Sequence, residues 1–508
     1  MKRKNKIQKQ EKTLNIARRD FLKFAPATAA IGVLGAVTAS KKAAAKVVED
    51  KVKKATVKVS EDFPYEIRDD YKPLPSYSSV HGHAFFGGPL MAMGVDVDKE
   101  AFEQGNKFLH DINYAHDNDK PGFDQASKAM CGGSWALSNT TVGPSPGAVG
   151  DFGLFSWDNP SDKDPRALMD HNFVKKEKYQ FKDKKEAANY IKRAATLYGA
   201  DLVGITKRDE KWDYSVNFSP VPPMGRKMFP MPPQSLEEFQ PMGKMMEEWT
   251  PDKWTYGWER AGFVPKSVVV VAFEMDYEAI STASTEVSAA AVGEGYSMMA
   301  KVSYQLAVMF RQLGYNAIPA GNDTGMSVPY AIAAGLGEGS RMGQLVTYKY
   351  GPRVRLAKVY TDFDFVEYDK PKTFGVFDFC KRCKLCADAC PGKAISQDDE
   401  PSFEPTHEHK DNAYFNAKGI KKWYLDAKNC FKQWEDLGTD CTNCICACPY
   451  NKPDFWHHRL VDSVNKSMPG PVHSFMREMD KVFGYGNVDD LASLKKFYSP
   501  KGKSYDGF

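Results

Sequence analysis

Nine of the ten cysteines in this 508-residue chain lie between positions 380 and 448. The stretch opens with Cys380–Pro391 (CKRCKLCADACP), continues with Cys430 and closes with Cys441–Pro449 (CTNCICACP). Thiolates at this successive spacing bind iron–sulfur cubes, and in chains with two such runs the fourth cysteine of each run serves the other cluster. The spacing therefore predicts two [4Fe–4S] clusters.

The same crossover rule assigns the ligands. Cys390 leaves its own run to join the second cluster, and Cys448 completes the first. Cys446 is then spare, and Cys131 stands alone in MCGGSW, so neither is expected to bind iron. The predicted sets are Cys380, Cys383, Cys386 and Cys448 for cluster 1, and Cys390, Cys430, Cys441 and Cys444 for cluster 2.

Zinc knuckles and disulfides are the alternatives for these cysteines. Structural zinc sites usually separate two C-x2-C pairs by a loop, whereas here three cysteines follow one another at x2 spacing before x3-C-P. Disulfides between cysteines packed along one turn would be strained. We therefore favour clusters over both.

The charge of the chain is concentrated at its start. Residues 1–46 carry 12 lysines and arginines against 2 acidic residues, which leaves 57 against 63 in the remainder. Without its basic leader the chain has no basic stripe, which argues against nucleic acid as a partner.

Residues 1–45 are expected to be a twin-arginine signal peptide. Arg18-Arg19 precedes a modest apolar run at 24–39, and Ala43-Ala44-Ala45 offers a cleavage site, so that the mature protein begins near Lys46. The alternative is a membrane anchor, but the run of roughly 16 residues, rich in Ala and Gly, is shorter than the about 20 apolar residues that spanning requires. Export by this route predicts a peripheral protein on the outer face of the cytoplasmic membrane.

The pattern of helices and strands predicted after residue 180 indicates an α/β core. Asp183 begins a helix that ends at Gly199, a strand follows at 201–206, and the apolar run at 267–273 is a strand buried on both faces. A helix is expected at about 295–313. Strands at 344–350 and 354–361 flank Gly351-Pro352 as a hairpin would.

The remaining segments are predicted with less regular structure. Residues 46–165 read as an irregular unit with few regular elements. Residues 208–262 form a Pro- and Met-rich loop that is too long for an ordinary connection. The His81-x-His83 pair lacks a third ligand for a metal site, and the glycines at 335–339 lack the strand and spacing of a dinucleotide fingerprint. The predicted divisions are 1–45 leader, 46–165 irregular unit, 166–370 α/β core, 371–455 two-cluster unit and 456–508 C-terminal extension.

Several motifs in this order resemble the reductive dehalogenases of organohalide-respiring bacteria. They are the twin-arginine leader, DLVGIT, GYSMMA, GNDTGMSVPYAIAAGLGEGSRMG, YGPRVRLAKVYTD and the two cysteine runs. The resemblance covers about residues 180–465 and is greatest to the tetrachloroethene and chloroalkane branch. It implies an α/β (α+β) corrinoid-binding core similar to a vestigial nitroreductase, followed by a bacterial two-[4Fe–4S] ferredoxin-like domain.

The resemblance also implies the chemistry. Such enzymes reductively remove halide from a small organohalide at a Co(I) corrinoid, with electrons supplied through the two clusters. The family's proton donor, its asparagine and its arginine fall on Tyr296, Asn322 and Arg355. A guanidinium beside a phenol stabilises the phenolate that remains after proton donation. The chain has no D-x-H-x-x-G, in agreement with a base-off cobalamin-type corrinoid that has no histidine ligand from below.

The implied partners are a chlorinated alkene or alkane, a small integral-membrane anchor protein, and electrons from the quinone pool or a membrane donor. Whether the chain is a monomer or a homodimer stays open. Two other functions were weighed: an exported, non-catalytic iron–sulfur electron-transfer subunit, and an enzyme like the cobalamin-dependent epoxyqueuosine reductase. A carrier does not need the α/β core, and the leader and acidic body argue against an enzyme that acts on tRNA.

Overall fold

The computed structural model describes residues 57–137, 173–218, 255–409, 415–452 and 491–499. The predicted leader and residues 219–254 of the predicted loop lie outside the described residues. All the helices and strands named below belong to one compact unit, made of residues 58–451 and 486–508.

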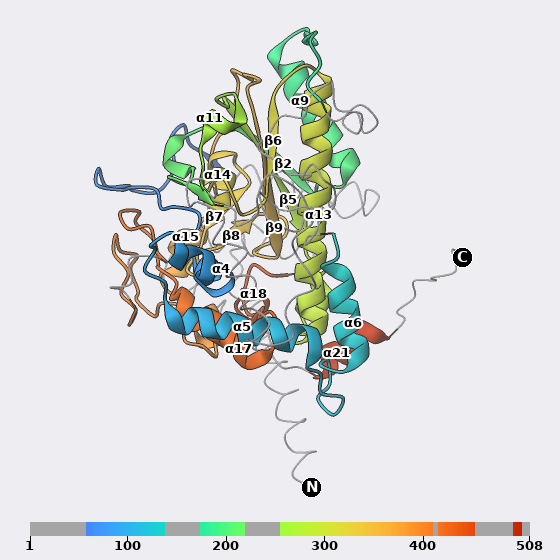
Figure 1. Ribbon diagram of the computed structural model, residues 1–508, viewed down its shortest axis with the longest axis vertical. Helices are drawn as coiled ribbons and strands as arrows, with labels where there is room; N and C mark the ends of the chain where they lie inside the picture. Colours follow the sequence, from blue (N-terminus) through green and yellow to red (C-terminus); the bar gives the residue numbers. More distant parts are fainter. Residues whose placement is uncertain (1–56, 138–172, 219–254, 410–414, 453–490, 500–508) are drawn as a thin grey trace, which may run out of the picture. The chain divides into compact units, whose positions relative to one another are not determined.

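A four-stranded antiparallel sheet forms the centre of this unit (Figure 1). Its order is β2 (Leu202–Lys207), β5 (Ser267–Glu274), β9 (Val354–Thr361) and β6 (Ala317–Ala320). The predicted strand at 267–273 is confirmed, because every residue of β5 except Glu274 is buried. Successive side chains of a strand face opposite sides, so a fully apolar run suits a strand covered on both faces.

Helices α9 (Lys184–Tyr198) and α13 (Glu286–Gln312) cover one face of the sheet. Their apolar side chains, such as Ile191 and Leu306, pack on Val269 and Val271 of β5. The helix predicted from Asp183 is confirmed: the Asp183 side chain accepts a hydrogen bond from the backbone of Glu186, and the helix ends at Gly199 with φ 120°. On the other face, α14 (Ser327–Ala333) packs against Val268 and Val270.

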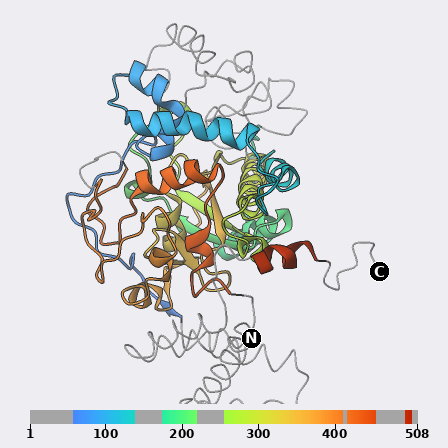
Figure 2. The same cartoon turned by 90° about the horizontal axis from the view of Figure 1, so that it is seen from below.

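Three helices lie in the described residues 57–137 that precede the core, which corrects the expectation of an irregular unit. They are α4 (Val80–Ala92), α5 (Lys99–Tyr114) and α6 (Gln125–Ser134). Asp98 and Asp124 cap the second and third by accepting hydrogen bonds from the backbone three residues on. Figure 2 shows α5 beside α17 (Ala427–Leu437), and Phe108 and Phe431 share one apolar cluster there. Burial of α4 and α5 against α17, and of α6 against α13, explains why these Gly-containing segments are helical.

The hairpin predicted across Gly351-Pro352 is also wrong. Strand β8 (Leu345–Thr347) pairs with β7 (Gly337–Gly339), whereas β9 joins β5 and β6 in the central sheet. Between β8 and β9 the chain makes only a single bridge, from Thr347 to Gly351. The long apolar run of β9 is better buried between two strands of the core than it would be in an outer hairpin.

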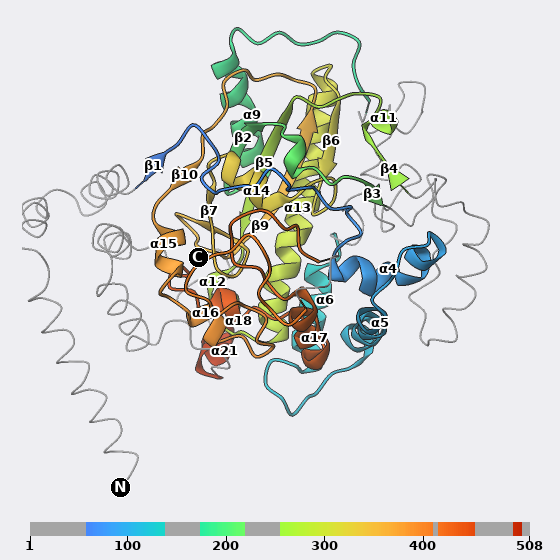
Figure 3. The same ribbon diagram turned by 90° about the vertical axis from the view of Figure 1, so that its left-hand side faces the viewer.

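Short elements complete the described residues. Figure 3 shows α15, α16 and α18 together beyond one end of the sheet. The short strands are β1 (Lys58–Val59), β3 (Asn217–Phe218), β4 (Thr255–Tyr256) and β10 (Lys372–Thr373). The short helices are η1 (Glu210–Trp212), α11 (Trp258–Ala261), α12 (Tyr277–Ile280), α15 (Val376–Cys380), α16 (Leu385–Asp388), α18 (Asn443–Cys446) and α21 (Leu491–Tyr498).

Candidate active site and iron–sulfur sites

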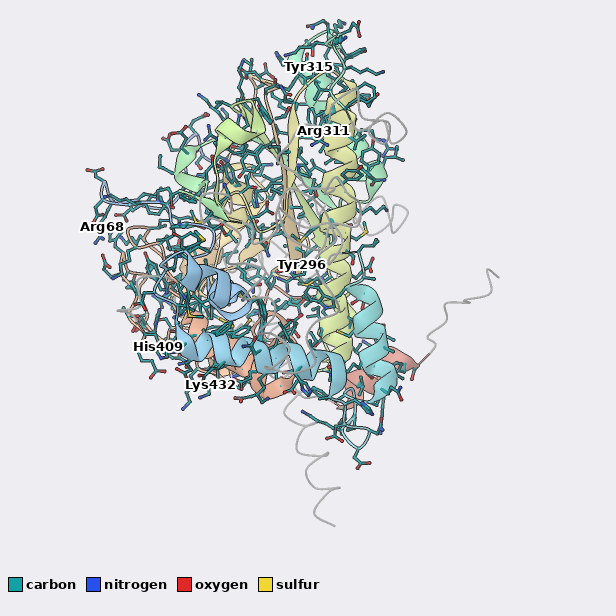
Figure 4. All side chains as sticks on the ribbon, viewed as in Figure 1. Arg68, Tyr296, Arg311, Tyr315, His409 and Lys432 are labelled. Atoms are coloured by element: carbon teal, nitrogen blue, oxygen red, sulfur yellow. The ribbon has the colours of Figure 1, made fainter. Side chains whose placement is uncertain are left out.

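Tyr296 lies in the middle of the long helix α13 rather than at a helix start (Figure 4). The helix begins at Glu286 because Thr285 caps it: the Thr285 hydroxyl accepts from the backbone of Ser288 at 3.3 Å, and the Ser288 hydroxyl accepts from the backbone of Thr285 at 3.2 Å. The expected start near Gly295 is therefore wrong. A serine in place of the usual Glu or Gln of a capping box hid this signal.

Two glycines in α13 make room for the side chains around Tyr296. A Cβ on Gly295 would lie 2.6 Å from Cγ of Arg355, and one on Gly293 would lie 2.5 Å from a ring carbon of Trp135. Glycine in a helix costs roughly 1 kcal/mol relative to Ala. Here the glycines let β9 and the end of α6 approach α13. The Trp135 ring therefore stacks on the Tyr296 ring with 4.9 Å between their centres, and Arg355 lies over the same ring.

The Tyr296 hydroxyl meets the loop that follows β6. Nδ2 of Asn322 donates a hydrogen bond to it at 2.9 Å, and Asn322 is exposed whereas Tyr296 is half-buried. Cζ of Arg355 lies 5.2 Å from the centre of the Tyr296 ring. The structure thus brings the three residues predicted for the active site together around one phenol.

A buried lysine holds the loop that carries Asn322. Nζ of Lys358, on β9, donates to the Gly321 carbonyl at 2.5 Å and to the Ser327 hydroxyl at 2.7 Å. The Asp323 carboxylate accepts from the backbone of Gly321 at 2.8 Å. Lys358 is 0% exposed, and this burial lowers its pKa to about 8, against the attraction of Asp323. These bonds fix the backbone on one side of Asn322.

Arg355 is flanked by a buried carboxyl group on the loop before α18. Burial raises the pKa of Asp440 to about 6, while Arg355 acts to lower it and Glu286 to raise it. Nε of Arg355 and Oδ2 of Asp440 are buried and have no hydrogen-bond partner. The same holds for Oγ1 of Thr442, two residues after Asp440. Unpaired buried polar atoms are costly, which indicates that a polar group binds beside them.

The predicted cluster ligands gather in one cysteine-rich region, where Cys383, Cys386 and Cys448 are buried and the other five are partly buried. Burial raises the pKa of Cys386 well above its ordinary value, and the charges of Cys380, Cys448 and Cys383 raise it further. Burial likewise raises the pKa of Cys444 to about 12, with Cys441 and Cys390 adding to the rise. Burial also raises the pKa of Cys430, and the charges of Cys444, Cys441 and Cys390 raise it further. Cys444 also acts on Cys386 and Cys448, so the thiols lie close together and their division into two ligand sets stays a prediction.

The arrangement of these sulfurs does not suit single metal ions. A tetrahedral zinc site would place its sulfurs roughly 3.8 Å apart, given Zn–S bonds of about 2.3 Å. Among the described residues, the one group of three ligand atoms all within 4.8 Å of one another is Glu408, His409 and Asp426, and it contains no cysteine. No three of the described cysteine sulfurs lie within 4.8 Å of one another.

Two histidines weighed as metal ligands serve in packing instead. Nδ1 of His83 accepts a hydrogen bond from the backbone of Asp98 at 3.0 Å, and the His81 ring lies 5.1 Å from that of Trp434. Neither belongs to the group of ligand atoms found in the described part of the chain. Cys131 is buried against Ala289 and Ala290 of α13, away from both predicted ligand sets in sequence.

Sequence reasoning missed three residues near these sites: Trp135, Lys358 and Arg341. The aromatic residues of the segment 46–165, Trp135 among them, suit core packing or the lining of a pocket, and the contact of Trp135 with Tyr296 depends on α6 packing on α13. Lys358 interrupts the apolar run of β9, and a lysine inside such a run is a signal that could have marked it. Arg341 had no local signal.

The α/β core is joined to a cysteine-rich unit with the spacing of two iron–sulfur clusters, which defines the class of iron–sulfur proteins. Residues 379–451 match the family model of a 4Fe-4S double cluster binding domain. The chain is 41% identical over 361 residues to a tetrachloroethene reductive dehalogenase of Desulfitobacterium hafniense, which is 68% of this chain and 61% of that protein. A tetrachloroethene reductive dehalogenase of Sulfurospirillum multivorans is 33% identical over 331 residues, 61% of this chain and 59% of that one.

A solved reductive dehalogenase has the same fold. The two structures superpose with a TM-score of 0.56 at 19% identity, over 87% of this chain and 51% of that one. The chain is therefore homologous to the reductive dehalogenases, and its match spans about three fifths of the length of its first relatives (61%). The mixed α/β fold and the double-cluster domain agree with the predictions from sequence.

The family implies a corrinoid, and the residues around Tyr296 fit such a group. The rim of a corrin ring carries amide side chains, which donate and accept hydrogen bonds. Beside Tyr296, the unpaired Nε of Arg355 offers a donor, and Oδ2 of Asp440, which interacts with Arg355, offers an acceptor. The described part of the chain contains no helix long and apolar enough to cross a membrane.

Proposed function

We propose that this chain is a reductive dehalogenase that removes halide from a small chlorinated alkene or alkane. The observation that carries the proposal is the contact of Tyr296 with Asn322 and Arg355, in a chain homologous to tetrachloroethene reductive dehalogenases. We also propose that its core is a variant of the nitroreductase fold. The overall reaction adds two electrons and one proton to the carbon–halogen bond, and it releases halide and the hydrogenated carbon product.

We infer the role of each residue from its contacts. The bound corrinoid supplies low-valent cobalt for breaking the carbon–halogen bond, and the clusters, held by the two cysteine sets, supply single electrons. Tyr296 gives the proton to the carbon fragment from its hydroxyl oxygen. Arg355 lies over the ring and stabilises the phenolate left behind, because a guanidinium keeps its charge in any pocket.

Asn322 orients the phenol in this proposal. Its amide donates to the hydroxyl oxygen of Tyr296, which leaves the hydroxyl proton free to point toward the substrate. The Trp135 ring stacks on Tyr296 and excludes water from that side. The amide carries no charge, so it does not compete with Arg355 for the phenolate.

The experiment that tests the function uses anaerobically purified protein. We expect about eight irons and about one cobalt per chain, and chloride release from tetrachloroethene with a reduced viologen as donor. A cobalt-free protein with both clusters and no chloride release would favour the electron-transfer subunit instead.

We further propose that the chain is exported through its Arg18-Arg19 signal and is held at the outer face of the cytoplasmic membrane by a small integral-membrane partner, with electrons from the quinone pool or a membrane donor. The support is the twin-arginine sequence itself. Replacing both arginines by lysine should leave the precursor inside the cell. Normal export of that variant would contradict the route.

A further inference from the structure

Arg341 is a fully buried arginine beside the first ligand of cluster 1. It is 0% exposed and lies on the turn between β7 and β8. Its Nε and Nη2 donate to the Cys380 carbonyl at 3.1 Å and 2.6 Å. Its Nη1 donates to the carbonyls of Ser396 and Asp398 at 2.7 Å and 2.6 Å. One guanidinium thus joins the start of the first cysteine run to the segment that follows it.

The charge of Arg341 has no carboxylate partner in contact. All its hydrogen-bond acceptors are backbone carbonyls, and no described carboxylate oxygen lies within the 4.0 Å of an ion pair. The nearby buried carboxyl, Glu338, accepts from the backbone N–H groups of Phe374 and Val376 instead. The guanidinium also lies 4.7 Å from the centre of the Trp423 ring.

A buried cation without a counter-ion is costly, and arginine does not lose its proton to avoid that cost. Carbonyl dipoles and an aromatic face offset only part of it. The thiolates of Cys380, Cys383, Cys386 and Cys448 with their bound cluster carry net negative charge, which grows by one on reduction. The exposed carboxylate of Asp399 interacts with Arg341 without contact and pairs with Lys384 at 2.7 Å, which leaves the bound cluster as the main counter-charge for Arg341.

We propose that Arg341 raises the reduction potential of the cluster held by Cys380, Cys383, Cys386 and Cys448. A fixed positive charge in a poorly solvated site stabilises the form with the extra electron, and net charge and burial are among the factors that set such potentials. The step is a one-electron reduction of the cluster by an external donor, in which no bond in the protein breaks and no proton moves. Arg341 touches neither substrate nor the reacting atoms, so it is a positioning residue.

The inference rests on the ligand assignment and does not depend on dehalogenation. Its test is a redox titration of the holoprotein with titanium(III) citrate, followed by electron paramagnetic resonance in the absence of any organohalide. Arg341→Met should move one of the two cluster potentials to a more negative value and shift the other less. Arg341→Lys keeps the charge and should stay nearer to the wild type than the Met variant.

Arg311 provides the matched control. It is 1% exposed, its Nη2 donates to the Ala317 carbonyl at 2.9 Å, and it lies in the last turn of α13, toward the end far from α18 (Figure 4). Arg311→Met also removes a buried arginine, so it controls for a general loss of packing. Both of its cluster potentials should equal those of the wild type.

Three results would overturn the inference. One is an Arg341→Met protein with about eight irons and two unshifted potentials. Another is an Arg341→Lys protein shifted as far as the Met variant, which would assign the effect to hydrogen bonding rather than charge. If the Met variant loses iron, Arg341→Gln keeps some of the carbonyl contacts and takes its place. Loss of cluster 1 in both would show that Arg341 holds the loop and does not set the potential.

Discussion

The two ends of the catalytic unit differ in how they handle charge. Around the cysteine runs, buried thiols and Arg341 surround sites that accept electrons, and the arginine cannot exchange its proton. Around Tyr296, an exposed amide donates a hydrogen bond to a half-buried phenol, and the nearest cation, Arg355, lies over the phenol ring. If the proposed function holds, the groups that supply electrons and the group that supplies the proton are different residues, so each can be removed without the other.

The largest expected effect is the loss of a cluster. Cys448→Ser should lower the iron content from about eight to about four per chain and abolish chloride release, because cluster 1 loses a ligand. Cys446→Ser, two residues away, should keep all the iron. Iron analysis of the purified variants decides between them, and the reverse pattern would overturn the ligand assignment.

Removing the proposed proton donor should slow dehalogenation without changing the clusters. Tyr296→Phe deletes one oxygen and keeps the ring that stacks on Trp135. Loss of a positioned general acid should lower the rate of dehalogenation by roughly 10² to 10⁴, with iron and cobalt content unchanged. Tyr190→Phe, at an exposed position on α9, is the matched control and should retain full activity. A Tyr296→Phe protein without cobalt would instead make Tyr296 structural.

A smaller loss is expected at Asn322, which orients the phenol without reacting. Asn322→Ala removes the 2.9 Å hydrogen bond to Tyr296. A hydrogen bond to a group that becomes charged contributes about 1.5 to 3 kcal/mol, so the rate should fall by roughly 10 to 100-fold. Asn322→Asp should be slower still, because its charge opposes the phenolate. An Asp variant faster than the Ala variant would contradict the role given to Asn322.

The smallest effect concerns pH and the lysine that holds the Asn322 loop. Burial lowers the pKa of Lys358 to about 8 from 10.5, so between these values the unfolded chain binds more protons than the folded chain. Folding stability should therefore gain from this group as the pH rises through that window, and Lys358→Met should lack the gain. Anaerobic thermal unfolding at several pH values measures it. Parallel curves for the two proteins would show that Lys358 titrates as in water.

The two ends also differ in how far the sequence predicts them. Cluster ligands lie within short runs at fixed spacing, so Cys380 and its neighbours can be assigned from the pattern alone. Tyr296, Asn322 and Arg355 come from α13, the loop after β6, and β9, and only the resemblance to a family joined them. The start of α13 was missed because Ser288 replaces the usual capping residue. Arg341 was missed because its hydrogen-bond acceptors are backbone carbonyls, which every residue has and no sequence pattern marks.

The helices of residues 80–134 show a different kind of miss. Asp98 precedes Ala101, Phe108 and Ile112, which share one apolar cluster with α17, and this cap and stripe were visible in the sequence. Gly105 obscured them, although its lack of a Cβ is what allows α5 to approach the carbonyl of Ala84. Tertiary packing thus overrode a low helix propensity.

In the proposed reaction, electrons from the clusters and a proton from Tyr296 together convert the organohalide to halide and the hydrogenated product. The direct measurement is to reduce the protein anaerobically, remove excess reductant and add tetrachloroethene while following the visible absorbance of the clusters. We predict that the clusters reoxidise and that one chloride appears for every two electrons lost, slowly in Tyr296→Phe. The proposed reaction would be contradicted if a protein with about one cobalt per chain kept its clusters reduced and formed no chloride.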